Sequence, residues 1–309
     1  MNNCDQIIKD IVENGYHVNS ISSRTVNYLS KISNDYIKKE EILTSKSESI
    51  YTAFRTILKK KSFEKSSFLK KIETIIIKFC SQINYYILIY IILMKLRREL
   101  NIFKMIAVLK KSLQGKLKSI NIDAYRSLPS NKQIISWHRD GHISKERLSN
   151  QKKFKYDKKF HTKAIKFFFF LDPKLKDRDV ISTEKSLAII PKTSNISHYI
   201  DHLVLTKSIP YFKNHYLEEM CSSVNYVLEN KNIDNFKIKN ELINYLKKTK
   251  NCSRKNDDTK NYDLPGAPSD LIIFDDKSIH RGAPTGKCER LVFRIILKFE
   301  IKNCQNLFL

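Results

Sequence analysis

Glycine and proline are scarce in this chain of 309 residues, which has 6 glycines and 7 prolines. Together they reach about a third of their ordinary share, which excludes a collagen-like chain and argues against a glycine-rich nucleotide-binding loop. Neither GxGxxG nor GxxxxGK[ST] is present, so dinucleotide and P-loop phosphate sites are not supported. The 41% of apolar residues still suffices for a sizeable core and argues against global disorder.

Paired cysteine motifs are also missing. The 6 cysteines are scattered without a CxxC, so a zinc ribbon or a dithiol redox motif is not supported. The opening residues MNNCDQIIKD lack the basic and then apolar pattern of a secretion signal, and a cytoplasmic location is expected. The most apolar run, 83–94, is shorter than the roughly 20 residues of a membrane span, which predicts a buried helix.

Acidic residues are few relative to basic ones. The chain has 57 Lys and Arg against 32 Asp and Glu, a formal charge of +25. Such a charge suggests nucleic acid, an anionic membrane surface or acidic ligands as partners. The favoured interpretation is compositional, because Lys, Asn and Ile are abundant along the whole chain while Arg is scarce. No obligate protein partner is indicated.

The distribution of prolines divides the chain near Pro129, the first of them. The first 128 residues lack breakers and predict a mainly helical portion. Helices are expected at about 3–13, 24–45, 49–60, 66–96 and 102–117, with a short strand near 15–18. From 129 to 302, strand-length apolar runs at 133–137, 164–171, 187–190, 270–274 and 290–299 predict a β-rich core.

A polar, partly helical insertion at about 203–262 interrupts that core, with helices expected near 218–228 and 239–248 and an exposed loop at 249–262. No Pro/Gly/Ser-rich linker separates the two portions, so 1–309 is expected to form a single domain. The expected fold class is α+β, with the helical N-terminal portion packed on the β-rich core.

Two segments carry residues suited to metal chemistry. In WHRDG (137–141), His138 and Asp140 share one face of an extended segment, because the side-chain period of a strand is two. The strand-like run that starts at Asp270 delivers His280 into the following turn. Two histidines and one carboxylate form the facial triad of non-haem Fe(II) oxygenases, which leaves positions open for a cosubstrate and dioxygen. A lone HxD is common by chance, and His138 could equally be an ordinary hydrogen-bonded histidine.

The last apolar run, 290–299, supports the oxygenase interpretation because its side chains alternate between two different faces. Arg290 and Arg294 share one face of 290–299, and four apolar residues share the other. Two arginines inside a barrel would be costly without an anionic partner, and a dicarboxylate would satisfy both by bidentate recognition. The alternative is a solvent-exposed face on an edge strand.

Four segments occur in an order that resembles the phytanoyl-CoA dioxygenase family of Fe(II)- and 2-oxoglutarate-dependent oxygenases. They are WHRDG (137–141), KAIKFFFFLD (163–172), SLAIIPKTS (186–194) and SDLIIFDDKSIHRGAPTGKCERLVF (269–293), and ENGYHV (13–18) resembles the family's opening. The ordered motifs cover roughly 131–300. The chain departs from the family pattern in the substrate-side loops, and Ser269 stands where a glycine is common.

The resemblance implies a double-stranded β-helix, also called a jelly roll or cupin-like core. It implies His138, Asp140 and His280 as iron ligands, Arg290 as the residue that binds the distal carboxylate of 2-oxoglutarate, and Thr285 as a weaker cosubstrate contact. The retained Asp140 favours hydroxylation over halogenation. The short separation between His280 and Arg290 favours the small-molecule branch of the wider superfamily over nucleic-acid demethylases.

Several other residues are candidates for the pocket or its surroundings. His142 follows the triad segment with the parity of Asp140 and either reaches substrate or, if the chain turns after Gly141, lies on the surface. Of the alternating phenylalanines in 167–170, one pair is expected to line the pocket and the other the core. Phe167 and Phe169 are the candidate pocket pair. Trp137 is expected to point away from the metal into the core, and His198 and His202 are interpreted as surface residues.

The function these observations favour is hydroxylation of a small organic molecule, neutral or anionic, with Fe(II), 2-oxoglutarate and O2, yielding succinate and CO2. One alternative is the same chemistry on nucleic acid or another anionic macromolecule, which the charge motivates. Another is a non-enzymatic basic nucleic-acid-binding protein in which the HxD motif and His280 occur together by chance.

Overall fold

The computed structural model describes residues 3–36, 48–49, 68–129, 136–141, 161–173, 185–231, 233–250, 252 and 262–301. The helices are α1 (Asn3–Asn14), α2 (Ser23–Tyr36), α4 (Phe68–Leu100), α5 (Ile102–Ser112), α7 (Ser194–Leu205), α8 (Leu217–Asn230) and α9 (Phe236–Thr249). The strands are β1 (Tyr16–Ser20), β2 (Glu48–Ser49), β3 (Gly115–Ser127), β4 (His161–Leu171), β5 (Lys185–Ile189), β6 (Asp263–Pro265), β7 (Asp270–Asp275), β8 (His280–Gly282) and β9 (Arg290–Ile301).

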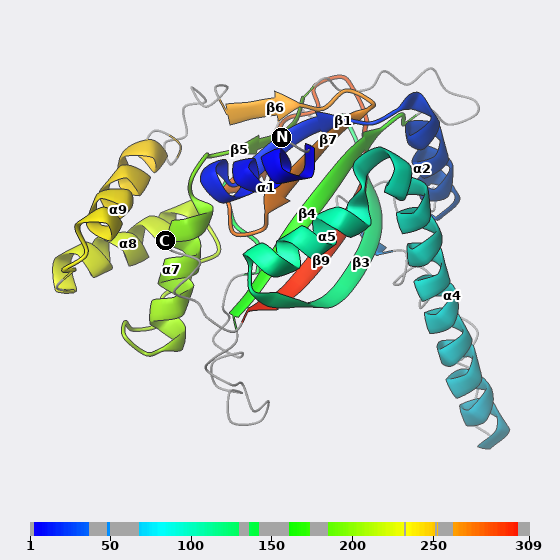
Figure 1. The fold of residues 1–309 in the computed structure, drawn as a ribbon, viewed down its shortest axis with the longest axis horizontal. Coiled ribbons are helices and arrows are strands. Elements are labelled where there is room, and N and C mark those ends of the chain that lie inside the picture. The colour runs from blue at the N-terminus through cyan, green and yellow to red at the C-terminus, as the bar shows by residue number, and fades with distance from the viewer. Residues whose placement is uncertain are drawn as a thin grey trace.

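The strands form two antiparallel sheets. Among the described residues, the larger has six strands in the order β1-β7-β4-β9-β3-β2, and the smaller has three in the order β6-β5-β8. Helices and antiparallel sheets occupy separate layers, so the predicted α+β class is confirmed (Figure 1).

Strand β9 lies inside the large sheet, paired with β4 on one side and β3 on the other. Its apolar face is fully buried, as the alternation in the sequence predicts. The residues of that face are Leu291, Phe293, Ile295 and Leu297. Because β9 is an interior strand, the alternative of a solvent-exposed edge strand for Arg290 and Arg294 is excluded.

Four helices cover the face of the large sheet to which Phe293 points. Buried residues of α1, α2, α4 and α5 form one core with residues of β3, β4, β7 and β9. In Figure 1, α1 and α5 lie across this sheet, whereas one end of α4 extends away from the rest of the molecule. Burial of an apolar stripe on each helix stabilises this layer by the hydrophobic effect. The predicted helical portion packed on the β-rich portion is therefore present in the described residues.

Strand β3 was not predicted. A helix was expected over 102–117, but α5 ends at Ser112 and the chain turns at Gln114, which has a positive φ of 46°. The 13-residue strand that follows pairs along β9. Ile122 and Ala124 are buried and alternate with polar residues, which is a strand pattern. The shortage of glycine and proline before Pro129 was misinterpreted as helix.

The opposite face of the large sheet meets the small sheet. Phe168, Phe170 and Phe274 pack with Leu187 and Ile189 of β5 in a second buried cluster. The inner faces of the two antiparallel sheets thus share a core. The candidate site described below lies at one end of this layer.

Helices α7, α8 and α9 form a third cluster beside the small sheet (Figure 1). Helices α8 and α9 confirm the two predicted in the insertion, whereas α7 was not predicted. Trp137 is buried in this cluster, as expected. Most of the predicted helix at 49–60 lies outside the described residues, and its first residue, Ser49, belongs to β2. Most of the expected loop at 249–262 also lies outside them. No helix in the described ranges has both the length and the apolar character that crossing a membrane requires.

Candidate metal centre

The segment 136–141 runs beside the start of β8 and is fixed there by main-chain hydrogen bonds. The N–H of His138 donates to the carbonyl of His280 over 2.9 Å, and the N–H of His280 donates back over 2.8 Å. The N–H of Asp140 donates to the carbonyl of Asp276 over 2.9 Å. These bonds align two segments that are far apart in the sequence, and they place the two histidines directly opposite each other.

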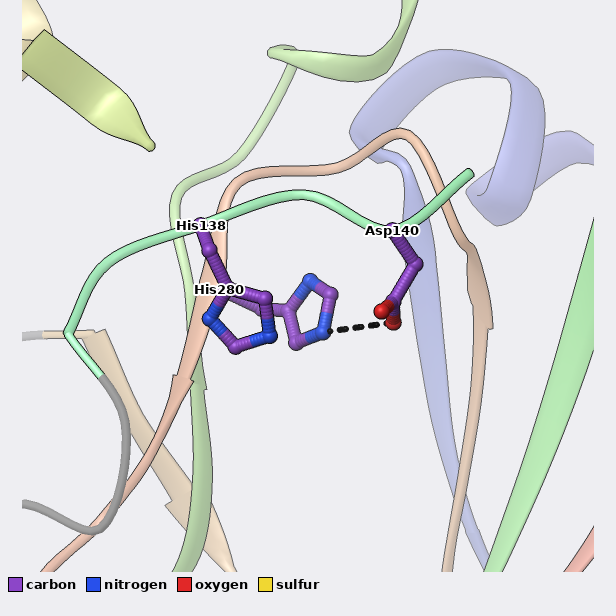
Figure 2. A group of neighbouring side chains, drawn as sticks. All are labelled: His138, Asp140 and His280. Atoms are coloured by element: carbon purple, nitrogen blue, oxygen red, sulfur yellow. Dashed lines mark ion pairs between the residues drawn. The ribbon is translucent and has the colours of Figure 1, made fainter. Parts of the chain in front are cut away.

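The side chains of His138, Asp140 and His280 point toward one another (Figure 2). One possible ligand atom from each lies within 4.8 Å of the other two. The ring centroids of the histidines are 4.5 Å apart, and Nε2 of His280 lies 3.1 Å from Oδ2 of Asp140. Both imidazoles are buried and the carboxylate is half-buried.

Both imidazoles are oriented by the backbone. Nδ1 of His138 lies 2.7 Å from the carbonyl of Ser136, and Nδ1 of His280 lies 2.8 Å from the carbonyl of Ser278. A carbonyl only accepts, so each Nδ1 carries a proton, and Nε2 is the nitrogen of each ring left to bind a metal. Backbone carbonyls commonly orient metal-binding histidines in this way. Two imidazole nitrogens and one carboxylate fit a divalent transition metal such as Fe(II).

The local electrostatics keep these groups in the forms that bind metal. Burial, reinforced by the neighbouring His280, lowers the pKa of His138 to about 3. Burial alone would raise the pKa of Asp140, but the Lys166 ammonium and the bond from His280 outweigh it and hold that pKa well below its usual range. At neutral pH, His138 is therefore neutral and Asp140 is ionised.

Lys166 belongs to the site and was not singled out from the sequence. It lies on β4, and its ammonium is hydrogen-bonded and ion-paired to the carboxylate of Asp140. It shares the inner face of β4 with Phe168, because side chains alternate along a strand. The signal was present in KAIKFFFFLD, where a lysine interrupts an otherwise apolar inner face.

His215 is a second site residue that sequence reasoning missed. Its ring centroid lies 5.5 Å from that of His138, and its Nδ1 lies 2.9 Å from the carbonyl of Arg139. It comes from the connection between α7 and α8, which also pairs through Tyr216 with His138. Nothing in the local sequence around His215 predicts this long-range placement.

Arg290 is the first residue of β9, and Thr285 lies in the turn that precedes this strand. Both are buried. Nη1 of Arg290 donates to the carbonyl of Ala283 over 3.0 Å, and Oγ1 of Thr285 donates to the carbonyl of Leu128 over 2.8 Å. Burial lowers the pKa of Arg290, and the nearby Tyr125 on β3 acts in the opposite direction. Arg290 faces the inner side of the sheet, like Val292.

The structure corrects the role predicted for Arg294. Asp123 on β3 binds its guanidinium in bidentate fashion, with Nε at 2.5 Å from Oδ1 and Nη2 at 2.7 Å from Oδ2. The same guanidinium lies 5.0 Å from the ring centroid of Tyr125. A carboxylate of the protein therefore already satisfies the charge that was expected to bind a dicarboxylate. The error follows from the missed strand β3, which supplies Asp123.

The candidate pocket pair of phenylalanines is also corrected. Phe167 and Phe169 have no exposed surface and pack in the helix-side core. Phe168 and Phe170 face the inner side, where the Phe168 ring lies 4.9 Å from that of Phe274 and the Phe274 ring lies 5.1 Å from that of His280. The parity of β4 therefore assigns the site side to the other pair.

Three further histidines were considered from the sequence. His142 lies outside the described residues. His198 was interpreted as a surface residue, but it is fully buried on α7, with Nε2 at 3.1 Å from Oδ2 of Asp275. His202 is half-buried on the same helix. The interpretation of His198 was wrong because α7 packs against the end of β7, a contact that sequence periodicity does not reveal.

No family model matches the chain, and no curated protein matches it in sequence. Among solved structures, EvdO2 from Micromonospora carbonacea var. aurantiaca matches at 10% identity and a TM-score of 0.41, over 96% of this chain and 90% of that one. EvdO2 complexed with 2-oxoglutarate matches at 10% identity and 0.40, over 95% and 89%. EvdMO1 matches at 9% identity and 0.37, over 96% of this chain and 49% of that one. These similarities are too low to assign a family.

Proposed function

We propose that the protein is an Fe(II)- and 2-oxoglutarate-dependent dioxygenase that hydroxylates a small organic substrate, with 1–309 forming one oxygenase domain on a double-stranded β-helix core. The observation that carries this proposal is the convergence of His138, Asp140 and His280 within 4.8 Å, with both imidazoles oriented through Nδ1. The inner faces of the two antiparallel sheets, between which the site lies, support the β-helix core.

Iron bound to these three residues would supply the activation of dioxygen, coupled to conversion of 2-oxoglutarate to succinate and CO2. The protein residues have separate tasks. Asp140 would supply the negative charge that a divalent cation needs, and the imidazoles of His138 and His280 would supply the other two ligands. The aromatic rings of Phe168 and Phe274 line the inner side next to His280 and exclude water from it.

Arg290 is the residue that would hold the distal carboxylate of 2-oxoglutarate. Its guanidinium is buried on the inner side of β9, and a buried arginine binds a carboxylate strongly and in a fixed orientation. Arg294 is not assigned this role because Asp123 already binds it. Thr285, buried in the turn before β9, would be a weaker contact to the same cosubstrate, once its hydroxyl turns from the Leu128 carbonyl.

The proposal is tested by anaerobic titration of the metal-free protein with Fe(II) and 2-oxoglutarate. Chelation of 2-oxoglutarate to iron gives a visible charge-transfer band, and succinate is measured after air is admitted. The wild type is expected to show the band. Asp140→Ala is expected to lose both the band and bound iron, and Arg290→Ala is expected to retain iron but to need more 2-oxoglutarate.

Arg24→Ala serves as the control, because Arg24 is exposed on α2 and lies outside the site. It is expected to behave as the wild type. A folded wild-type protein that binds neither iron nor 2-oxoglutarate would contradict the oxygenase proposal. If His138→Ala or Asp140→Ala forms succinate as fast as the wild type does, the metal ligands are assigned wrongly.

A further inference from the structure

Arg139 lies between the two ligand residues of the segment 136–141, and its side chain points away from the metal centre. Side chains alternate along an extended segment, so the guanidinium lies on the opposite side from His138 and Asp140. The side chain is fully buried, with 0% of its surface exposed. Burying a charge is costly unless it is paired and hydrogen-bonded.

The contacts of Arg139 meet that requirement and connect three parts of the chain. Nε donates to the carbonyl of Asn214 over 2.5 Å, and Nη1 donates to the carbonyl of Ser197 over 3.0 Å. Nη2 lies 2.6 Å from Oδ1 of Asp201. Ser197 and Asp201 belong to α7, and Asn214 belongs to the connection between α7 and α8. The ligand segment is thereby attached to the helical insertion.

A second buried cation, Lys277, connects Asp201 with the ligand segment. Nζ of Lys277 lies 2.7 Å from Oδ2 of Asp201 and is also hydrogen-bonded to the carbonyl of Gly141. Lys277 lies in the turn that leads from β7 to His280. Asp201 therefore connects the backbone that carries Asp140 with the turn that carries His280.

The main-chain atoms of Arg139 strengthen the same attachment. Its N–H donates to the carbonyl of His215 over 2.9 Å, and its carbonyl lies 2.9 Å from Nδ1 of His215. Arg139 is thus held through its backbone and its guanidinium at once. This arrangement restricts both translation and rotation of the segment between the two ligand residues.

We propose that Arg139, acting through Asp201 and Lys277, is a positioning residue that fixes the geometry of the metal ligands His138 and Asp140. Buried ion networks add little net stability compared with apolar packing, whereas the rigid fork of arginine fixes direction. Lysine keeps the charge but cannot reach the acceptors on α7 and the connection at once. The inference rests on the proposed metal site and adds to it a group that no metal atom would touch.

The test is a titration of the metal-free protein with Co(II), which replaces Fe(II) without oxidation and reports its ligand geometry in the visible absorption bands. Arg139→Lys is expected to bind Co(II) about 10- to 100-fold more weakly than the wild type, the range typical of residues that orient metal ligands. Its bands are expected to change in position or intensity, because the ligand angles are no longer fixed.

The matched control is Arg126→Lys. Arg126 is also buried and ion-paired, with Nη1 at 3.4 Å from Oε2 of Glu289, and its Nη2 donates to Oδ1 of Asn34 over 2.6 Å. It lies on β3, away from the ligand segment. This variant is expected to lose stability, measured by urea unfolding, while keeping the Co(II) affinity and bands of the wild type. If Arg139 had only a structural role, Arg139→Lys would also lose stability while keeping the Co(II) affinity and bands of the wild type.

Asp201→Asn is the second variant and keeps the inference testable if Arg139→Lys does not fold. It is expected to weaken Co(II) binding in the same direction, and the effect of the double variant is expected to be smaller than the two single effects combined. If folded Arg139→Lys and Asp201→Asn both retain the affinity and bands of the wild type, the positioning role is wrong. If the wild type binds no Co(II), the proposed metal site itself fails.

Discussion

The ammonium of Lys166 is bound to the carboxylate of Asp140, a residue 26 positions earlier in the chain. This contact places a fixed positive charge beside the carboxylate that a metal ion would use. Lys166 keeps Asp140 ionised, but it also repels a divalent cation. The two effects differ in sign, and the second decides metal affinity because Asp140 is already ionised at neutral pH.

We therefore expect Lys166→Met to bind Co(II) more tightly than the wild type. Two unit charges about 4 Å apart repel each other by about 4 kcal/mol at an effective dielectric constant of about 20, and a divalent ion doubles this, but side-chain rearrangement and solvent remove most of it. The expected gain is about tenfold in affinity, measured by titration of the metal-free protein. Lys166→Arg retains the charge and is expected to bind as the wild type does. Weaker binding by Lys166→Met would mean that Lys166 orients Asp140 more than it repels the metal.

The ion pair between Arg294 and Asp123 is mostly buried, with 15% and 12% of the two side chains exposed. Asp123→Leu leaves the guanidinium without its bidentate partner, and we expect the free energy of unfolding to fall by about 3 kcal/mol. The additional change Arg294→Met removes the stranded charge and is expected to recover most of that loss. Urea unfolding of the four variants of this cycle measures the coupling.

Glu13→Ala provides the comparison for this cycle. Glu13 pairs with Lys9 at 4.0 Å on the surface of α1, with more than half of each side chain exposed. Exposed pairs at this helical spacing contribute about 0.3–0.5 kcal/mol, so this change is expected to have a small effect. If Asp123→Leu costs no more than Glu13→Ala, the bidentate contact does not hold in solution.

The residues that the sequence predicted correctly are those whose placement depends on local periodicity. His138 and Asp140 share a face because they are two residues apart, and the alternation of β9 predicts which of its side chains are buried. Pairing between distant segments was not predictable in the same way. Asp123 reached Arg294 only through the pairing of β3 with β9.

The missed site residues follow the same rule. Lys166 and His215 meet the triad through strand pairing and through the connection between α7 and α8. The lysine within KAIKFFFFLD is a local signal, but that signal does not identify Asp140 as its partner, and nothing around His215 predicts its contact. The parity of β4 was recognised, but which parity faces the site depends on which face of the sheet the helices cover. That choice is a property of tertiary packing. It places Phe167 and Phe169 in the helix-side core and Phe168 and Phe170 on the inner side, the reverse of the prediction.

The buried His198 makes stability depend on pH. Burial lowers its pKa, although Asp275 acts in the opposite direction. Above the unfolded value of about 6.5, the histidine is neutral in both states and contributes no pH dependence. As pH falls below that value, the unfolded chain takes up a proton that the folded protein does not, so the free energy of unfolding decreases until pH reaches the folded pKa.

We expect this loss to approach at most about 1.4 kcal/mol per pH unit for one proton. His198→Gln removes the titrating group, so its stability should depend less steeply on pH than that of the wild type. Urea unfolding between about pH 5 and pH 7 compares the slopes, and the absolute stability of the variant does not enter the comparison. Equal slopes would show that His198 titrates normally in the folded protein.

The backbone at Ser269 predicts a stabilising substitution. Ser269 has a positive φ of 98°, a conformation that residues with a Cβ rarely adopt. The structure enforces it at the entry to β7, where the Ser269 N–H donates to the carbonyl of Phe170 over 3.1 Å and its own carbonyl accepts from Ile21 over 2.8 Å. Glycine adopts such angles without steric cost.

Ser269→Gly is therefore expected to raise the free energy of unfolding by about 0.5–1 kcal/mol. A left-handed conformation costs a residue with a Cβ about 1–2 kcal/mol, and the extra freedom of glycine in the unfolded chain offsets part of the gain. Ser269→Ala removes the hydroxyl but keeps the Cβ, so it should give no stabilisation and separates the backbone effect from loss of the side-chain oxygen. If Ser269→Gly is no more stable than Ser269→Ala in urea unfolding, the backbone at this position is not strained.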